Sequence, residues 1–274
     1  MSLKIPEDFT EFLYWIKERT ESFWNTKLDK NNSDYVCEDW MFGAKWIGMS
    51  EEEINITENK YNIKFTEYHR KFLKILHTID RKELILNWNE DENGNPISKE
   101  RSLFYNWMTD HDEIKKYLEW PYEFLLEDVM RDYIWLDSWG KKPEQNENKK
   151  KIFSNWFNNS PKLIPIYAHR FVISEPINSD NPVLSIYGHD TIIYGGNMRH
   201  YLINELKEEL NLFEEVYDNE YEEFYDEPKK ELKEIQEYEL NLLKNKEIPV
   251  WKEFLISNGF NNYLDSRLED LANE

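Results

Sequence analysis

The chain has 274 residues, a length that suits one enlarged domain or two small ones. Its 55 acidic and 34 basic residues give a formal net charge of -21, which repels phosphate backbones and disfavours direct nucleic-acid binding. Aromatic residues make up 16% of the chain and charged residues 32%, a combination that argues against global disorder. The negative charge suits a basic protein partner, although it also serves solubility alone.

The single cysteine, Cys37, allows neither an intrachain disulfide nor a cluster of thiolate metal ligands. No segment has the continuous apolar length that spans a bilayer, and the start of the chain lacks the basic and apolar parts of a secretory signal. We therefore expect a cytoplasmic protein without a membrane segment.

The first third of the sequence predicts three helices. Apolar residues recur at helical spacing over 6–25, and Ser50 with Glu53 forms a capping box that begins a helix over 51–61. Another helix begins near Thr66, with Phe72, Leu73, Leu76 and Ile79 on one face. The aromatic segment 39–50 contains two glycines and is expected to be a loop with short extended pieces.

The middle of the sequence predicts two strands and then helices. Residues 82–88 and 102–108 have the composition of strands, and residues 89–98 between them are rich in turn formers. Asp110 is placed to cap a helix that runs through Leu118, and Pro121 is placed to open another. A further helix is expected over 149–157.

The last part of the sequence begins with a β-rich segment. Residues 162–196 alternate β-branched and aromatic runs with Pro, Gly and Asn, which predicts three or four adjacent antiparallel strands. A helix is expected over 197–213 and another from Pro228, and Pro249 and Gly259 bracket a short final helix.

His189 and Asp190 stand together between two apolar runs and invite interpretation as a catalytic pair. The Gly-His-Asp sequence is also what a three-residue hairpin loop requires, because glycine accepts a positive φ and Asx side chains bond nearby amides. The chain has no nucleophile elbow, and Cys37 lacks the surroundings of known cysteine hydrolases. We favour the turn and predict no catalytic residues.

Metal and cofactor sites are not predicted either. The six histidines never form the i, i+4 pair that holds one ion on a helix, and no phosphate-binding glycine motif occurs. Five tryptophans could present a ligand groove, although packing in a core or interface is their more usual role. They are Trp107, Trp120, Trp135, Trp139 and Trp156.

Three stretches, over 46–76, 135–140 and 163–206, share a pattern with a known family. The residues that carry it are Trp46, Gly48, Glu58, Trp139, Gly140, Pro182, Asp190, Tyr194 and Gly195. This pattern resembles the SUKH superfamily, which includes the fungal regulator of cell-wall (glucan) synthesis and many bacterial immunity proteins of polymorphic toxin systems. Asn62 and Thr66 depart from the family, which commonly has Gly and Pro there, so the turn between them is expected to differ.

The resemblance implies an α+β fold in which helices pack against a mixed, largely antiparallel sheet. It covers residues 40–210 with an enlarged middle segment, and leaves helical extensions over 1–39 and 211–274, of which the second begins acidic. It also implies a protein that binds another protein rather than an enzyme, with the motif residues in structural roles. We expect an immunity protein that neutralises a cognate toxin.

The partner-binding surface is expected in the most acidic part of the chain, which has eleven acids and one lysine between Glu205 and Glu227. The predicted surface consists of Glu214, Glu215, Asp218, Glu220, Glu222 and Glu223, with Tyr217, Tyr221, Phe224 and Tyr225 interleaved. A basic toxin such as a nuclease is the kind of partner that this surface suits. A solvated charged helix or a disordered linker would produce the same pattern.

Two other functions stay open at this point. One is a regulatory scaffold like the fungal relatives, which assembles proteins without neutralising any of them. The other is an enzyme of unrecognised type that uses His169, Arg170, His189 and Asp190, if the hairpin brings them into one pocket.

Overall fold

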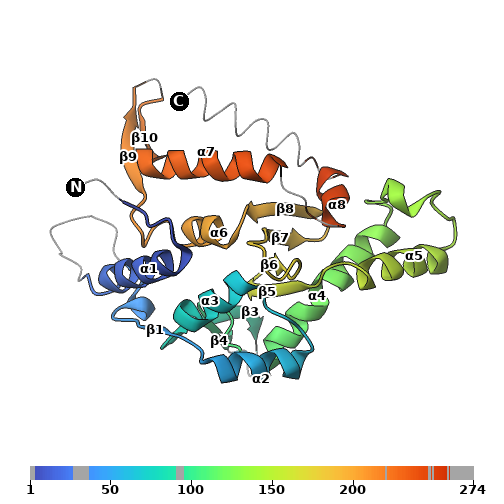
Figure 1. The fold of residues 1–274 in the computed structure, drawn as a ribbon, viewed down its shortest axis with the longest axis horizontal. Helices are drawn as coiled ribbons and strands as arrows, with labels where there is room; N and C mark the ends of the chain where they lie inside the picture. Colours follow the sequence, from blue (N-terminus) through green and yellow to red (C-terminus); the bar gives the residue numbers. More distant parts are fainter. Residues whose placement is uncertain are drawn as a thin grey trace.

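A four-stranded sheet lies at the centre of the protein, which we describe from a computed structural model over residues 4–26, 37–90, 96–219, 221–245, 248, 250–257 and 259 (Figure 1). Its strands are β5 (Leu163–Tyr167), β6 (Arg170–Ile173), β7 (Val183–Tyr187) and β8 (Asp190–Gly195). They pair in chain order and every pairing is antiparallel. The expected cluster of antiparallel strands is confirmed.

The two faces of this sheet pack on two different cores. Ile164, Val172 and Val183 point into a first core, while Phe171 and Leu184 point into a second. Successive side chains of a strand point to opposite faces, so one apolar run supplies both cores. This burial of both faces explains why the strands are nearly continuous runs of apolar residues.

Helices from the first third of the chain, and one that follows the sheet, form the first core. They are α1 (Phe9–Phe23), α2 (Glu51–Tyr61), α3 (Glu67–Leu76) and α6 (Met198–Glu205), joined by the short elements η1 (Asp39–Met41), β1 (Trp46–Ile47) and β2 (Thr78–Ile79). The Ser50 and Glu53 capping box is present at the start of α2, as predicted. Ile79 lies in β2 rather than on the face of α3.

The second core is built from α4 (His111–Met130), η2 (Asp137–Trp139), α5 (Asn146–Asn158), α7 (Lys230–Asn245) and α8 (Trp251–Ser257). Pro121 lies inside α4, so the prediction of two helices there is wrong. The helix continues through the proline because Ile114 on one side and Leu125 on the other are both fully buried. Asp110 precedes α4 without a side-chain cap, because its carboxylate instead accepts hydrogen bonds from Lys82 and the Asn106 amide.

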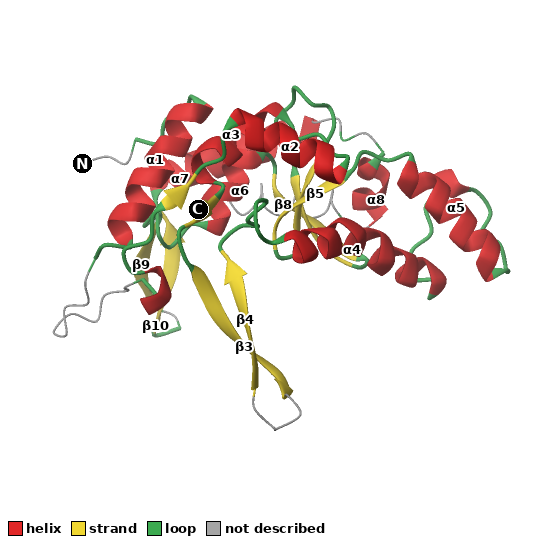
Figure 2. Cartoon of the chain, turned by 90° about the horizontal axis from the view of Figure 1, so that it is seen from below, coloured by secondary structure: helices red, strands yellow, loops and turns green. Residues whose placement is uncertain are grey.

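Two separate hairpins complete the fold. The first joins β3 (Lys82–Glu90) to β4 (Pro96–Ser102) and extends away from the helices in Figure 2. The strand expected over 102–108 is therefore misplaced, because Phe104 and Trp107 pack in the first core as irregular chain. The second hairpin joins β9 (Phe213–Asp218) to β10 (Glu223–Pro228).

The architecture is α+β, as expected, and all described strand pairs are antiparallel. The segments that flank the family pattern pack on the same cores as the rest of the chain. Helix α1 contributes to the first core, and α7 contributes Leu232 to the first core and Leu240 to the second. The helix expected over 197–213 ends at Glu205, and the chain then makes turns that bury Leu210 before β9.

Candidate protein-binding surface

The predicted acidic surface forms a two-stranded hairpin, residues 213–228, which we call the acidic hairpin. The strands pair from Phe213 opposite Pro228 to Asp218 opposite Glu223, and the turn between them includes Glu222 at a φ of 56°. A charged helix or a linker, the alternatives raised by the sequence, is therefore not the structure of this segment. Glu220 lies outside the described residues.

Large aromatic side chains of the acidic hairpin face solvent. Tyr221 is 71% exposed and Phe224 is 62% exposed, and Tyr217 and Tyr225 are also exposed. Tyr217 and Phe224 are cross-strand partners whose ring centroids lie 4.9 Å apart in an edge-to-face arrangement. Such a pair stabilises a strand register, and it also presents a continuous apolar surface to a partner.

Like charges face each other across the acidic hairpin. The register sets Glu214 opposite Glu227 and Asp218 opposite Glu223. Like charges directly opposite each other destabilise a pair of strands by a few tenths of a kcal/mol to about 1 kcal/mol. Each of these two pairs therefore keeps a repulsion that replacement of one of its acids by a neutral residue would remove.

Basic side chains gather at the base of the acidic hairpin rather than at its tip. The Lys233 ammonium lies 2.5 Å from the Glu227 carboxylate, and the Lys229 side chain donates to Asn211. The Lys229 amide also donates to the Leu212 carbonyl at 3.0 Å and closes the base. Of the acids nearer the tip, Glu222 and Glu223 have no ion pair within the described part of the chain.

His189 and Asp190 occupy a tight turn, as we favoured, although its loop has two residues rather than three. Tyr187 pairs with Asp190, so only Gly188 and His189 lie between the strands, and Gly188 has a φ of 62°. The Asp128 carboxylate of α4 accepts from both the His189 amide and its ring nitrogen Nδ1, the latter at 3.1 Å. His189 is thus oriented by Asp128 and not by Asp190.

Three of the four residues of the enzyme alternative lie near one another, because the charges of Arg170 and Asp190 both act on the pKa of His169. Arg170 donates to the Ser185 hydroxyl at 2.8 Å, and its guanidinium lies 3.8 Å from the centroid of the Tyr194 ring. Burial first, and then the charge of Arg170, lowers the pKa of His169. The structure therefore holds Arg170 and His189 through separate contacts.

The first family stretch is used for packing in this structure. Trp46 is buried, and its indole nitrogen donates to the Thr20 hydroxyl at 2.8 Å. A Cβ added to Gly48 would lie 2.0 Å from the Lys74 carbonyl oxygen, so only glycine lets these backbones approach. Asn62, where the family has Gly, adopts the left-handed conformation at a φ of 50°, and Thr66 caps α3.

Glu58 is the one family residue with a buried charge. Its carboxylate accepts from the Phe65 amide and from Arg70, both at 2.9 Å, and from Lys64 at 2.8 Å. Burial raises its pKa, but these hydrogen bonds outweigh burial and hold the pKa of Glu58 below its ordinary value. The three contacts join the end of α2 to the loop before α3 and to α3 itself.

The other family residues lie in or beside the sheet and η2. Gly195 allows close packing, because an added Cβ would lie 2.6 Å from the Tyr201 amide nitrogen. The Gly140 carbonyl accepts from the Trp135 indole, and Trp139 packs edge to face on Trp135. Pro182 is buried, and Asp190 is exposed at the start of β8.

The five tryptophans do not form a single stripe. Trp107 belongs to the first core, and the other four pack against the second. Trp139 and Trp156 also line a pocket of about 750 Å³, so part of the groove interpretation has a counterpart in the structure.

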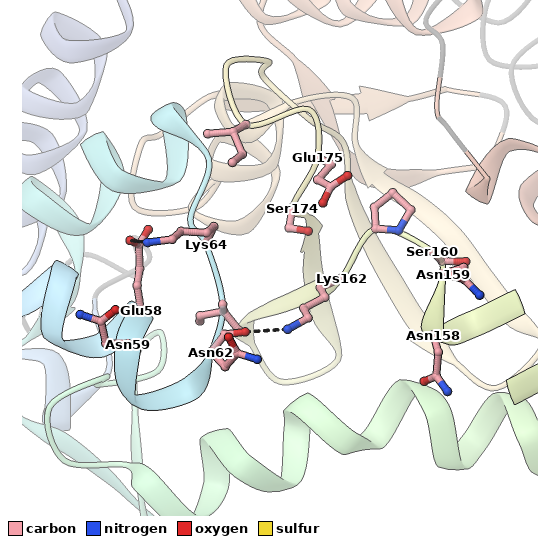
Figure 3. Close-up of a pocket in the computed structure, with 13 residues that line it drawn as sticks. Glu58, Asn59, Asn62, Lys64, Asn158, Asn159, Ser160, Lys162, Ser174 and Glu175 are labelled. Carbon is pink, nitrogen blue, oxygen red and sulfur yellow. Dashed lines mark hydrogen bonds and ion pairs between the residues drawn. The ribbon is translucent and has the colours of Figure 1, made fainter. Parts of the chain in front are cut away.

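Sequence reasoning missed a polar pocket of about 570 Å³ (Figure 3). Its walls come from three segments, which are Glu58 to Lys64 at and after the end of α2, Asn158 to Lys162 between α5 and β5, and Ser174 to Ile177 after β6. Lys162 crosses it and donates to the Asn62 carbonyl at 2.6 Å. No local motif could have revealed a site that three distant segments assemble.

The described residues contain no group of three or more His, Cys, Asp or Glu side chains arranged to hold a metal ion. None of the helices in the described ranges has the length and apolar character to cross a membrane. No protein-family model, curated protein or solved structure matches this chain.

Proposed function

We propose that this chain is a protein-binding module whose acidic hairpin binds a basic surface of another protein. The single observation that carries the proposal is the exposed Tyr217 and Phe224 ring pair, set among carboxylates that repel one another across the strands. A structure that serves only stability would bury the rings and separate the like charges.

The hairpin would act in two steps. Its charge and that of the whole chain speed the encounter with a basic partner, because complementary potentials raise association rates. The rings then lose water against the partner and slow dissociation, as buried aromatic residues do at the centre of interfaces. A cation placed near Asp218 and Glu223 would also remove their mutual repulsion.

The finer proposal is that the chain is an immunity protein and that its partner is a toxin with a basic active surface, such as a nuclease. Support comes from the resemblance to the SUKH superfamily, carried by residues such as Trp46, Gly48 and Gly195, whose close contacts are consistent with a retained framework. A carboxylate-rich hairpin on the toxin would compete with the phosphates of its substrate.

The test first asks whether a gene beside this one encodes a basic nuclease toxin. Binding of the intact chain to that gene product is then measured by surface plasmon resonance at two salt concentrations. A ring variant carries Tyr217→Ala and Phe224→Ala, and a charge variant carries Glu214→Lys and Glu223→Lys. The matched control carries Glu52→Lys and Glu144→Lys, two exposed acids on other elements that change the net charge equally.

The ring variant is expected to weaken binding by about tenfold or more, chiefly through faster dissociation. The charge variant is expected to slow association about tenfold and to reduce its dependence on salt, and the control is expected to match the wild type. If the wild type inhibits the nuclease and the hairpin variants do not, the result supports the immunity function. If the wild type binds the nuclease without inhibiting it, the result supports the scaffold function. Full affinity in both hairpin variants would refute the binding surface.

A further inference from the structure

A groove runs along one face of α5, and it is the pocket of about 750 Å³ that two of the tryptophans line. Its lining comes from Ser138, Trp139 and Pro143 on one side and from the segment Asn148 to Trp156 of α5 on the other, and we call it the α5 groove. It lies at the opposite end of the molecule from the acidic hairpin (Figure 1 and Figure 2).

Two tryptophan rings give the α5 groove an apolar wall that is already in position. The ring centroids of Trp139 and Trp156 lie 5.4 Å apart at an interplanar angle of 66°. Trp139 packs edge to face on Phe153 in the second core. Trp156 packs on Trp251 and Phe254 of α8. Rings that are held from behind lose little freedom when a ligand binds, so this wall favours a ligand with a flat apolar body.

The side chains of α5 that line the groove form a polar row and an apolar row. Asn148, Lys151 and Asn155 follow one another at spacings of three and four residues, so they lie along one line of the helix surface. Ile152 and Trp156 form the neighbouring row, one position further along the chain. A ligand that lies along α5 therefore meets polar groups on one edge and apolar groups on the other.

The lining of the α5 groove contains one charged side chain, the ammonium of Lys151. Lys151 has no ion pair or hydrogen bond among the described residues, and Glu147, one turn earlier in α5, does not pair with it. The Asp132 carboxylate is already paired with Lys142 at 3.3 Å and with Lys149 at 2.6 Å. The lining thus has a positive and no negative side chain, so it favours an anion.

The unused polar groups of the α5 groove include more donors than acceptors. The Lys151 ammonium only donates. The side-chain nitrogen of Asn155 has no acceptor among the described residues, whereas its side-chain oxygen accepts from Asn159 at 3.4 Å. The Ser138 amide already donates to the Glu253 carboxylate at 2.9 Å. A ligand whose polar end only accepts hydrogen bonds suits this set, and an ionised carboxylate is such a group.

We propose that the α5 groove binds a carboxylate that a short chain joins to an aromatic ring. The carboxylate lies between Lys151 and Asn155, which are neighbours one turn apart, and the ring lies against Trp139 and Trp156. Free aromatic acids and the C-terminal aromatic residue of a peptide share this chemistry. The site is separate from the acidic hairpin and does not depend on it.

The experiment is an NMR titration of the full chain with four probes, namely 3-phenylpropanoate, acetate, 3-phenyl-1-propanol and 3-phenylpropylammonium. The first is expected to shift the indole signals of Trp139 and Trp156 with a Kd on the order of 1 mM, as befits so small a ligand. Acetate lacks the ring and phenylpropanol lacks the charge, so each is expected to bind about tenfold more weakly or less.

The ammonium probe separates the charge of the groove from the charge of the chain. The net charge of -21 attracts cations to the protein in general, whereas Lys151 repels them from the α5 groove. We therefore expect that 3-phenylpropylammonium leaves the two indole signals unchanged at concentrations where 3-phenylpropanoate saturates them.

Three variants and a control locate the site. Lys151→Gln is expected to weaken 3-phenylpropanoate about tenfold, Lys151→Arg to retain binding, and Asn155→Ala to weaken it severalfold. The matched control is Lys150→Gln, which removes an equal charge from the adjacent exposed position outside the lining and is expected to change nothing. Circular dichroism checks that each variant is folded.

The proposal is overturned if 3-phenylpropanoate causes no saturable shifts, if 3-phenylpropylammonium binds the groove equally well, or if Lys151→Gln and Lys150→Gln have the same effect. Titration with Nα-acetylphenylalanine separates the two sources of the group. Binding as tight as that of 3-phenylpropanoate assigns the groove to peptide C-termini, and much weaker binding assigns it to free acids. Lys151→Gln is expected to leave toxin binding by the acidic hairpin intact, so the two proposals fail separately.

Discussion

The central sheet and the acidic hairpin are both antiparallel and both use short connections, yet they present opposite surfaces. Strands β5 to β8 bury apolar side chains on both faces, and β9 and β10 expose aromatic and acidic side chains on both faces. Strand pairing alone therefore does not tell which residues maintain the fold. Burial shows which residues maintain the fold, so substitution of the same residue type is expected to change stability differently in the sheet and in the hairpin.

Exchange of a phenylalanine for alanine in each region tests this comparison most strongly. Phe171 is fully buried in the sheet, whereas Phe224 is 62% exposed on the hairpin. Phe171→Ala is expected to lower the free energy of unfolding by about 3 to 5 kcal/mol, and Phe224→Ala by less than about 1 kcal/mol. Urea unfolding of both variants measures the difference, and equal losses would show that the hairpin is also part of the core.

A titration between the two regions is expected to have the next largest effect. Glu209 lies in the turns that lead from α6 to β9, and burial raises its pKa to about 7, with smaller contributions from Glu208, Glu205 and Glu38. The folded state therefore holds a proton that the unfolded state releases at its ordinary pKa of 4.5. The resulting stability is complete below pH 4.5 and is lost as the pH rises through about 7.

Glu209→Gln keeps the neutral form at every pH. Its stability is expected to equal that of the wild type near pH 4.5 and to exceed it by roughly 1 to 3 kcal/mol at about pH 8. Thermal unfolding across this range gives the result, and Glu144→Gln is the control. A difference that does not vary with pH would contradict the role of Glu209.

The turn of the sheet depends on one carboxylate from a helix. Asp128 is buried and accepts from the His189 amide, so Asp128→Ala leaves that donor without a partner. We expect a loss of about 1 to 3 kcal/mol in the free energy of unfolding. Glu123→Ala, on an exposed position of the same helix, is expected to have little effect. Similar losses in the two variants would mean that α4 itself, and not the turn, was disturbed.

The smallest expected effect is a gain in stability rather than a loss. Glu223→Lys places a cation opposite Asp218 and replaces a repulsion by an attraction. The hairpin is expected to gain about 0.2 to 1 kcal/mol, seen as greater amide protection from hydrogen exchange in β9 and β10. Unchanged protection would show that these carboxylates do not interact across the strands.

Local signals explain what the sequence predicted well. The Ser50 capping box marks the start of α2, and the alternating runs over 162–196 mark the strands of the sheet. Two local signals misled. Pro121 has the pattern of a helix start, but buried residues on both sides keep it inside α4. The apolar run at Phe104 has the composition of a strand, but it is irregular chain in which the Leu103 carbonyl accepts from the Thr78 hydroxyl.

The composition of the sequence predicted where the candidate surface lies but not its structure. Charge and aromatic content single out residues 214–225. The pairing of Tyr217 with Phe224 depends on the register of the two strands, and acidic strands without apolar alternation do not specify that register. The polar pocket has no local signal in the sequence. Glu58, Asn158 and Ser174 meet only because the chain folds, so no spacing along the sequence predicts them.

Helix α7 follows the acidic hairpin directly and touches both cores, through Leu232 at its beginning and Leu240 further along. Lys233, in the first turn of α7, pairs with Glu227 of the hairpin. A protein that binds the hairpin would therefore also restrain helix α7, which packs on both cores. Binding of a partner to the acidic hairpin would raise the melting temperature of the whole chain and not only the stability of the hairpin.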